Sequence, residues 1–181
     1  MDRSRSNASL YQFFSGMTEY VFQTRLGVAD PPLVEYISAM LTRFIHTDAI
    51  YKVRNLSGRR LEEVASMVAE AEARAGDARR EVHRHIGDFA LFWTGVYPEF
   101  LRRMEREGRS DQLLDYRQQG KRAYYIASTI QNDENRGENE LLERLSHEFE
   151  LCAYGLGELR REWERREPAE GDDHAGPWII N

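Results

Sequence analysis

The sequence has very little cysteine and lysine, and it has no long apolar run. Cys152 is its only cysteine, so the chain cannot form an intramolecular disulfide, and this count fits a reducing compartment. The longest apolar stretch, residues 89–96, is far shorter than the roughly 20 residues that a membrane-spanning helix needs. The first ten residues, MDRSRSNASL, lack the apolar core of a secretory signal. We therefore expect a cytoplasmic protein that is not associated with a membrane.

Positive charge is outnumbered by negative charge, with 25 Lys and Arg against 31 Asp and Glu and a formal net charge of −6. A negative balance argues against nucleic acid and against anionic membrane surfaces as partners. The partners that remain are another protein or a second copy of the chain. Lys52 and Lys121 are the only lysines, so arginine carries nearly all of the positive charge. Arginine forms bidentate contacts with carboxylates and phosphates, which lysine does not.

Helical periodicity dominates the chain, and no segment alternates convincingly as a strand would. Small residues at 120, 123 and 127 predict a close approach between two helices. Because short connections favour antiparallel neighbours, the sequence predicts an all-α fold, a single bundle of about six helices with up-and-down antiparallel packing. The predicted helices cover about residues 9–25, 30–53, 60–75, 77–97, 111–131 and 139–166, with a short continuation from Pro98 to Gly108.

The bundle is predicted over residues 9–166, between two ends of different character. Residues 1–8 are polar and are expected to be disordered. Residues 167–181 are expected to form a flexible acidic tail that ends on the apolar residues Trp178, Ile179 and Ile180. An exposed apolar cluster is a liability. Two interpretations of this end therefore stay open, docking on the bundle or binding to a partner protein.

The most apolar stretch of the chain, EVHRHIGDFALFWTGVYPEF, contains an ionisable pair, His85 and Asp88. His85 shares a helix face with Phe89, Phe92 and Val96, and Asp88 lies on the same side. Ionisable groups on an apolar face are costly unless they are hydrogen-bonded, paired or bound to a ligand. This stretch is therefore the first place in which to expect a site.

Two further carboxylates are candidates for the same site. Asp48 is predicted on the apolar face of the helix over residues 30–53, and Glu148 at the edge of the helix over residues 139–166. If these helices are neighbours, His85, Asp88, Asp48 and Glu148 could hold Fe or Zn, or His85 could ligate haem. The alternative is structural: His85 donates to Asp48 or Asp88, and the network fixes the register of the helices.

A second pattern overlaps the first, because Arg80 and His85 are separated by four residues. This spacing resembles the R-x4–6-H signature of the HEPN-type ribonucleases, which are small all-α domains. The resemblance implies that Arg80 contacts phosphate and that His85 handles protons at the ribose 2′-hydroxyl. It covers six residues, and Glu81 stands where the family usually places Asn, Asp or His.

No motif specifies an enzyme class, and three hypotheses about function stay open. The first is an interaction or regulatory module in which the buried His and Asp are structural. The second is a bundle that carries a metal or haem near His85 and Asp88. The third is a HEPN-like ribonuclease that uses Arg80 and His85. The first is favoured, because neither alternative has a complete motif.

Overall fold

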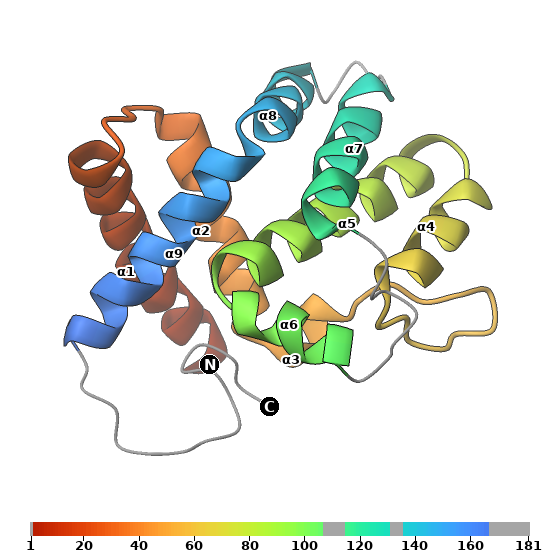
Figure 1. The fold of residues 1–181 in the computed structure, drawn as a ribbon, viewed down its shortest axis with the longest axis horizontal. Coiled ribbons are helices and arrows are strands. Elements are labelled where there is room, and N and C mark those ends of the chain that lie inside the picture. Colours follow the sequence, from red (N-terminus) through yellow and green to blue (C-terminus); the bar gives the residue numbers. More distant parts are fainter. Residues whose placement is uncertain (1, 107–114, 131–135, 167–181) are drawn as a thin grey trace. The chain divides into compact units, whose positions relative to one another are not determined.

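The computed structural model describes residues 2–106, 115–130 and 136–166 of the chain. These residues form nine helices (Figure 1), and an isolated β-bridge pairs Arg54 with Arg60. The predicted all-α class is confirmed, although the helices are shorter and more numerous than the six or so expected. They belong to two compact units. Among the described residues, the first combines those up to Ile50 with residues 154–166, and the second lies within Tyr51–Ala153.

The first unit contains α1 (Asp2–Arg25), α2 (Pro31–Phe44), α3 (Thr47–Ile50) and the later turns of α9 (Phe149–Arg166). The predicted start of α2 is confirmed: Asp30 accepts a hydrogen bond from the Leu33 N–H at 3.2 Å, and Pro31 occupies the first turn. Gly27, with a φ of 69°, takes the left-handed conformation just after α1 ends. α1 then packs against α2.

Aromatic residues of α1 pack against α9 in the first unit. The ring centroid of Trp163 lies 4.8 Å from that of Phe13 and 5.9 Å from that of Phe14. Gly155 lies so close to Phe22 that an added Cβ would come within 2.7 Å of the ring. Segments from near both ends of the chain therefore build one core.

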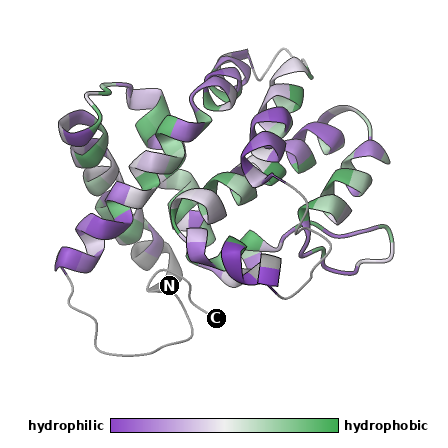
Figure 2. Ribbon diagram, viewed as in Figure 1, coloured by the Kyte–Doolittle hydropathy of each residue, from purple (hydrophilic) through white to green (hydrophobic). Residues whose placement is uncertain are grey.

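The second unit contains α4 (Val64–Glu72), α5 (Gly76–Gly95), α6 (Pro98–Arg106), α7 (Tyr116–Thr129) and α8 (Arg136–His147). Its central helix is α5, which packs against α4, α6 and α7, while α7 also packs against α8. Figure 2 shows hydrophobic and hydrophilic residues interleaved along the helices, as expected where one face of each is buried. Residues 85–93 of α5 are all buried, so the most apolar stretch of the sequence forms the core of this unit.

Two glycines allow the helices of the second unit to approach closely. A Cβ on Gly120 of α7 would come within 2.4 Å of the Phe149 ring and 2.9 Å of the Ala90 Cβ. A Cβ on Gly87 of α5 would come within 2.5 Å of the Tyr124 ring. The close approach predicted from the small residue at position 120 is therefore confirmed.

The predicted helix over residues 30–53 is wrong in its second half. α2 ends at Phe44, and α3 begins separately at Thr47. Between them the His46 N–H donates to the Arg43 carbonyl at 3.3 Å, an i to i−3 bond that tightens the chain out of the α-helical path. Likewise, the helix expected over residues 139–166 is two helices, α8 and α9, which meet at Glu148.

The ends of the chain differ from the prediction in one respect. α1 begins at Asp2, so the stretch expected to be disordered, residues 1–8, lies almost wholly in the helix. The reason is that residues 2–8 contain neither glycine nor proline to stop it. The predicted tail, 167–181, and the two interpretations of Trp178 lie outside the described residues. No helix among the described residues is both long enough and apolar enough to cross a membrane.

Candidate functional site

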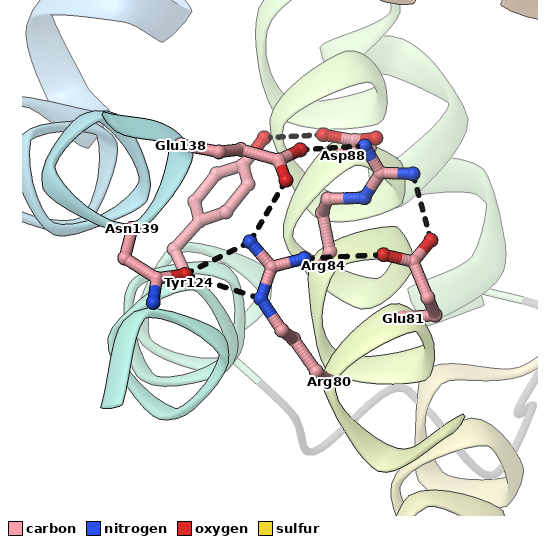
Figure 3. A network of polar contacts seen from close by, with 7 residues as sticks. All are labelled: Arg80, Glu81, Arg84, Asp88, Tyr124, Glu138 and Asn139. Atoms are coloured by element: carbon pink, nitrogen blue, oxygen red, sulfur yellow. Dashed lines mark hydrogen bonds and ion pairs between the residues drawn. The ribbon is translucent and has the colours of Figure 1, made fainter. Parts of the chain in front are cut away.

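A ring of alternating charges joins α5 to the start of α8 (Figure 3). Arg80 donates to Glu138 Oε2 at 2.8 Å and to Glu81 Oε1 at 3.2 Å. Arg84 donates to the remaining oxygens, Glu138 Oε1 at 2.9 Å and Glu81 Oε2 at 2.7 Å. Arg80 also donates to Asn139 Oδ1 from Nε at 3.1 Å and from Nη2 at 2.9 Å. Each carboxylate therefore bridges both guanidinium groups.

The ring satisfies a buried positive charge, since Arg80 is only 2% exposed. Removing a guanidinium from water costs several kcal/mol unless its donors are paired, and here all three nitrogens of Arg80 donate. Arg80 and Arg84 are four residues apart, which places both on the face of α5 that reaches α8. The ring therefore fixes the register of α5 against α8, and each of the three nitrogens of Arg80 takes part in it or bonds to Asn139.

One turn further along α5, Asp88 accepts a hydrogen bond from the Tyr124 hydroxyl at 2.8 Å (Figure 3). Asp88 is 1% exposed and Tyr124 is fully buried. Gly87 makes the contact possible, because any side chain there would collide with the Tyr124 ring. The predicted burial of Asp88 is confirmed, while the predicted donation from His85 to Asp48 or Asp88 stays a prediction. The partner of Asp88 on α7 was not foreseen, because periodicity placed Tyr124 on the core stripe without assigning a bond to its hydroxyl.

The four predicted metal ligands have different surroundings. His85 and Asp88 are buried on α5, as expected. Asp48 and Glu148 were expected on or beside buried faces, but both are exposed. Asp48 leaves the apolar face because α2 ends four residues before it, and Glu148 lies at the junction of α8 and α9.

Metal ligation finds no support in the part of the chain that the structure describes. No three His, Cys, Asp or Glu side chains gather there in a way that could hold a metal ion. The Fe or Zn site at His85, Asp88, Asp48 and Glu148 stays a prediction, as does a haem ligated by His85.

The HEPN-like reading required Arg80 to meet a phosphate and His85 to move a proton. In the structure the Arg80 guanidinium is bonded to Glu138, Glu81 and Asn139. His85 is 1% exposed, beside the Phe89 ring at 6.3 Å between centroids. Arg80 is thus engaged by α5 and α8 and the His85 ring is buried, and the HEPN-like ribonuclease stays a prediction.

A small recess opens among α4, α5 and α7 around His83, a residue that the sequence did not single out. Its volume is about 20 Å³. His83 is 2% exposed, and neither ring nitrogen has a hydrogen-bond partner among the described residues. Its Nε2 lies 3.9 Å from Glu72 Oε1, beyond hydrogen-bonding distance. Burial, together with the charges of Arg79 and Arg122, lowers the pKa of His83 below its ordinary value, although Glu72 opposes this.

A second hollow, a groove of about 250 Å³, lies in the first unit between α1 and the start of α2. Three of its lining residues carry carboxylates, Glu19, Asp30 and Glu35, and none of the described lining residues is basic. The residues of α1 recur at every fourth position, which places them in one stripe along the helix. The lining consists of Tyr11, Ser15, Glu19, Gln23, Asp30, Pro31, Val34 and Glu35.

Comparison of the chain with models of protein families, with curated proteins and with solved structures finds no significant match.

Proposed function

We propose that this chain is an interaction module that binds a basic segment of a partner protein in the groove between α1 and α2. The single observation that carries the proposal is the acidic lining of that groove. Glu19, Asp30 and Glu35 contribute three carboxylates, and the described lining residues include neither arginine nor lysine. Complementary charge guides the encounter of two proteins and selects between partners.

The groove also offers apolar contact for the stem of a long basic side chain. Tyr11 and Val34 lie among its lining residues. Arginine and lysine bury their aliphatic stems along apolar surface and keep the charged end near polar groups. A guanidinium is also attracted to the face of a tyrosine ring. A side chain with both properties suits this groove better than a purely apolar one.

The size of the groove favours a peptide segment over a cofactor. Clefts that enclose small-molecule ligands usually measure about 300–1,000 Å³. The groove, at about 250 Å³, lies just below that range, so it suits one or two side chains of a partner.

Fluorescence polarisation with a labelled arginine-rich peptide tests the proposal. The double variant Glu19→Gln, Glu35→Gln should bind about tenfold more weakly, because each exposed charge contact contributes up to about 1 kcal/mol. Binding should also weaken with added salt, since the groove is open to solvent. The matched control is Glu140→Gln, Glu143→Gln on α8, where both glutamates are exposed and the change in net charge is the same.

Equal loss of affinity in the two double variants would contradict the proposal, because the peptide would then respond only to overall charge. Absence of binding by the unchanged protein at low salt would contradict it as well. The other partner expected from the sequence, a second copy of the chain, stays a prediction. Sedimentation of the unchanged protein would reveal such a dimer.

A further inference from the structure

The recess around His83 is built from groups that the acidic groove does not use. His83 of α5 lies at its buried side, Glu72 comes from α4, and Gln119 and Arg122 come from α7. A volume of about 20 Å³ accommodates one water-sized group, since a single water needs about 10–15 Å³ measured in this way. The recess can therefore take in one atom of a larger ligand while the rest of that ligand stays outside.

The ring nitrogens of His83, unpaired within the described parts of the chain, are the feature of the recess that indicates a ligand. Buried polar atoms in folded proteins are nearly always hydrogen-bonded, and leaving one unbonded is costly. Among the described residues neither ring nitrogen of His83 has a partner, although the side chain is 2% exposed. One of these nitrogens carries a hydrogen in the neutral ring and both do in the charged ring, so the recess offers at least one unused donor.

The charges around the recess select the sign of the ligand. Arg79 donates to both oxygens of Glu72, at 3.2 and 3.1 Å, and so offsets the one nearby carboxylate. Arg122 is exposed and has no hydrogen bond or ion pair within the described parts of the chain. The remaining charge at the mouth is therefore positive, which disfavours a metal cation and favours an anion.

We propose that this recess binds one oxygen of a phosphate group, with His83 donating from inside and Arg122 and Gln119 donating from the mouth. Arginine suits this role because its planar fork of N–H donors matches the oxygens of a phosphate. The phosphate is either the free ion or a monoester on a phosphorylated side chain, since both present the same oxygens. The proposal concerns the second unit and does not depend on the groove of the first.

Binding should change the titration of His83 in a defined direction. Its neighbours are Glu72 on α4, Arg79 on α5 and Arg122 on α7, and burial together with the two arginines holds its pKa below the ordinary value. A bound phosphate adds negative charge next to the ring and stabilises the protonated form. The pKa of His83 should therefore rise when the site is filled.

NMR of the histidine rings in the full-length protein tests the proposal, with inorganic phosphate and a phosphoserine peptide as separate probes. The chain has five histidines, and the His83 signals are those that disappear in His83→Gln. We expect a saturable shift of these signals and a higher His83 pKa. Saturation by inorganic phosphate alone identifies the free ion, and saturation by the peptide alone identifies a phosphorylated side chain.

Two variants of α7 separate this site from general attraction to positive charge. Arg122→Gln should weaken phosphate binding about tenfold or more, because it removes a charged donor. Arg117→Gln, which removes an arginine 61% exposed on the same helix, should leave binding unchanged. Equal binding in Arg122→Gln and the unchanged protein would overturn the proposal. No shift of the His83 signals by either probe at millimolar concentration would overturn it too.

Discussion

The hydroxyl of Tyr124 makes a bond that its neighbour in sequence does not, and this difference gives a direct test. Tyr124→Phe should lower the free energy of unfolding by about 1–3 kcal/mol, because Asp88 loses a donor in a buried position. Tyr125→Phe is the control, since Tyr125 is 51% exposed and should change stability by less than about 0.5 kcal/mol. Urea denaturation measures both. Equal effects of the two substitutions would mean that the buried bond is not the source of stability.

Asp88 and Arg80 also show which properties of a single residue can be predicted from the sequence and which cannot. The burial of Asp88 followed from its place beside an apolar helix face, which is local information. Its partner, Tyr124, is 36 positions away, and the partner of Arg80, Glu138, is 58 positions away. Helical periodicity relates residues three or four positions apart, so it identifies a buried polar residue without identifying what bonds to it.

The close contact between α5 and α7 depends on two glycines, Gly87 and Gly120. Gly87→Ala and Gly120→Ala should each destabilise the protein by about 1–3 kcal/mol, because the added methyl meets aromatic rings at 2.5 and 2.4 Å. Gly16→Ala on α1 is the control. A Cβ there has nothing within 4 Å, so alanine should stabilise the helix by about 0.5–1 kcal/mol.

Thermal unfolding followed by circular dichroism compares the three alanine variants. Destabilisation of all three by the same amount would show that close packing at Gly87 and Gly120 is not the cause. A neutral Gly120→Ala alone would mean that the Phe149 ring moves aside at little cost.

Helix boundaries that carry a local capping signal were more predictable than boundaries that carry none. Asp30 followed by Pro31 is a strong local signal, and α2 begins there. The end of α2 at Phe44 and the junction at Glu148 have no glycine or proline within two residues to announce them. Such ends depend on tertiary packing, which overrides weak local preference. The prediction from the sequence therefore joined pairs of helices that are separate in the structure.

At the scale of the whole molecule, the fold class could be predicted from the sequence, but the division into two compact units could not. Periodicity over the entire chain indicated helices, and the class is confirmed. The first unit, in contrast, joins α1 and α2 to the end of α9. Its aromatic contact between Phe13 and Trp163 links residues 150 positions apart in the printed sequence. No local pattern can reveal such a pairing, so the two units could not be anticipated.

Removing the later turns of α9 should therefore affect the first unit selectively. In a chain that ends after Ala153, Phe14 and Phe22 lose the packing of Trp163 and Gly155. We expect faster amide hydrogen exchange throughout α1 and α2 and continued protection of α5 and α7, measured by mass spectrometry. The control ends after Arg166 and keeps the whole of α9. Unchanged protection of α1 in the shorter chain would contradict this expectation.

The composition of the first unit from both ends of the chain has a consequence for synthesis on the ribosome. α1 and α2 are made first, and the part of α9 that completes their core is made only after the roughly 100 residues of the second unit. At typical rates of about 5–20 residues per second, that interval lasts about 5–20 s. During this interval the apolar faces of α1 and α2 lack the packing that α9 later provides. Exposed apolar surface on a nascent chain is what chaperones bind, so we expect α1 and α2 to engage them during this interval.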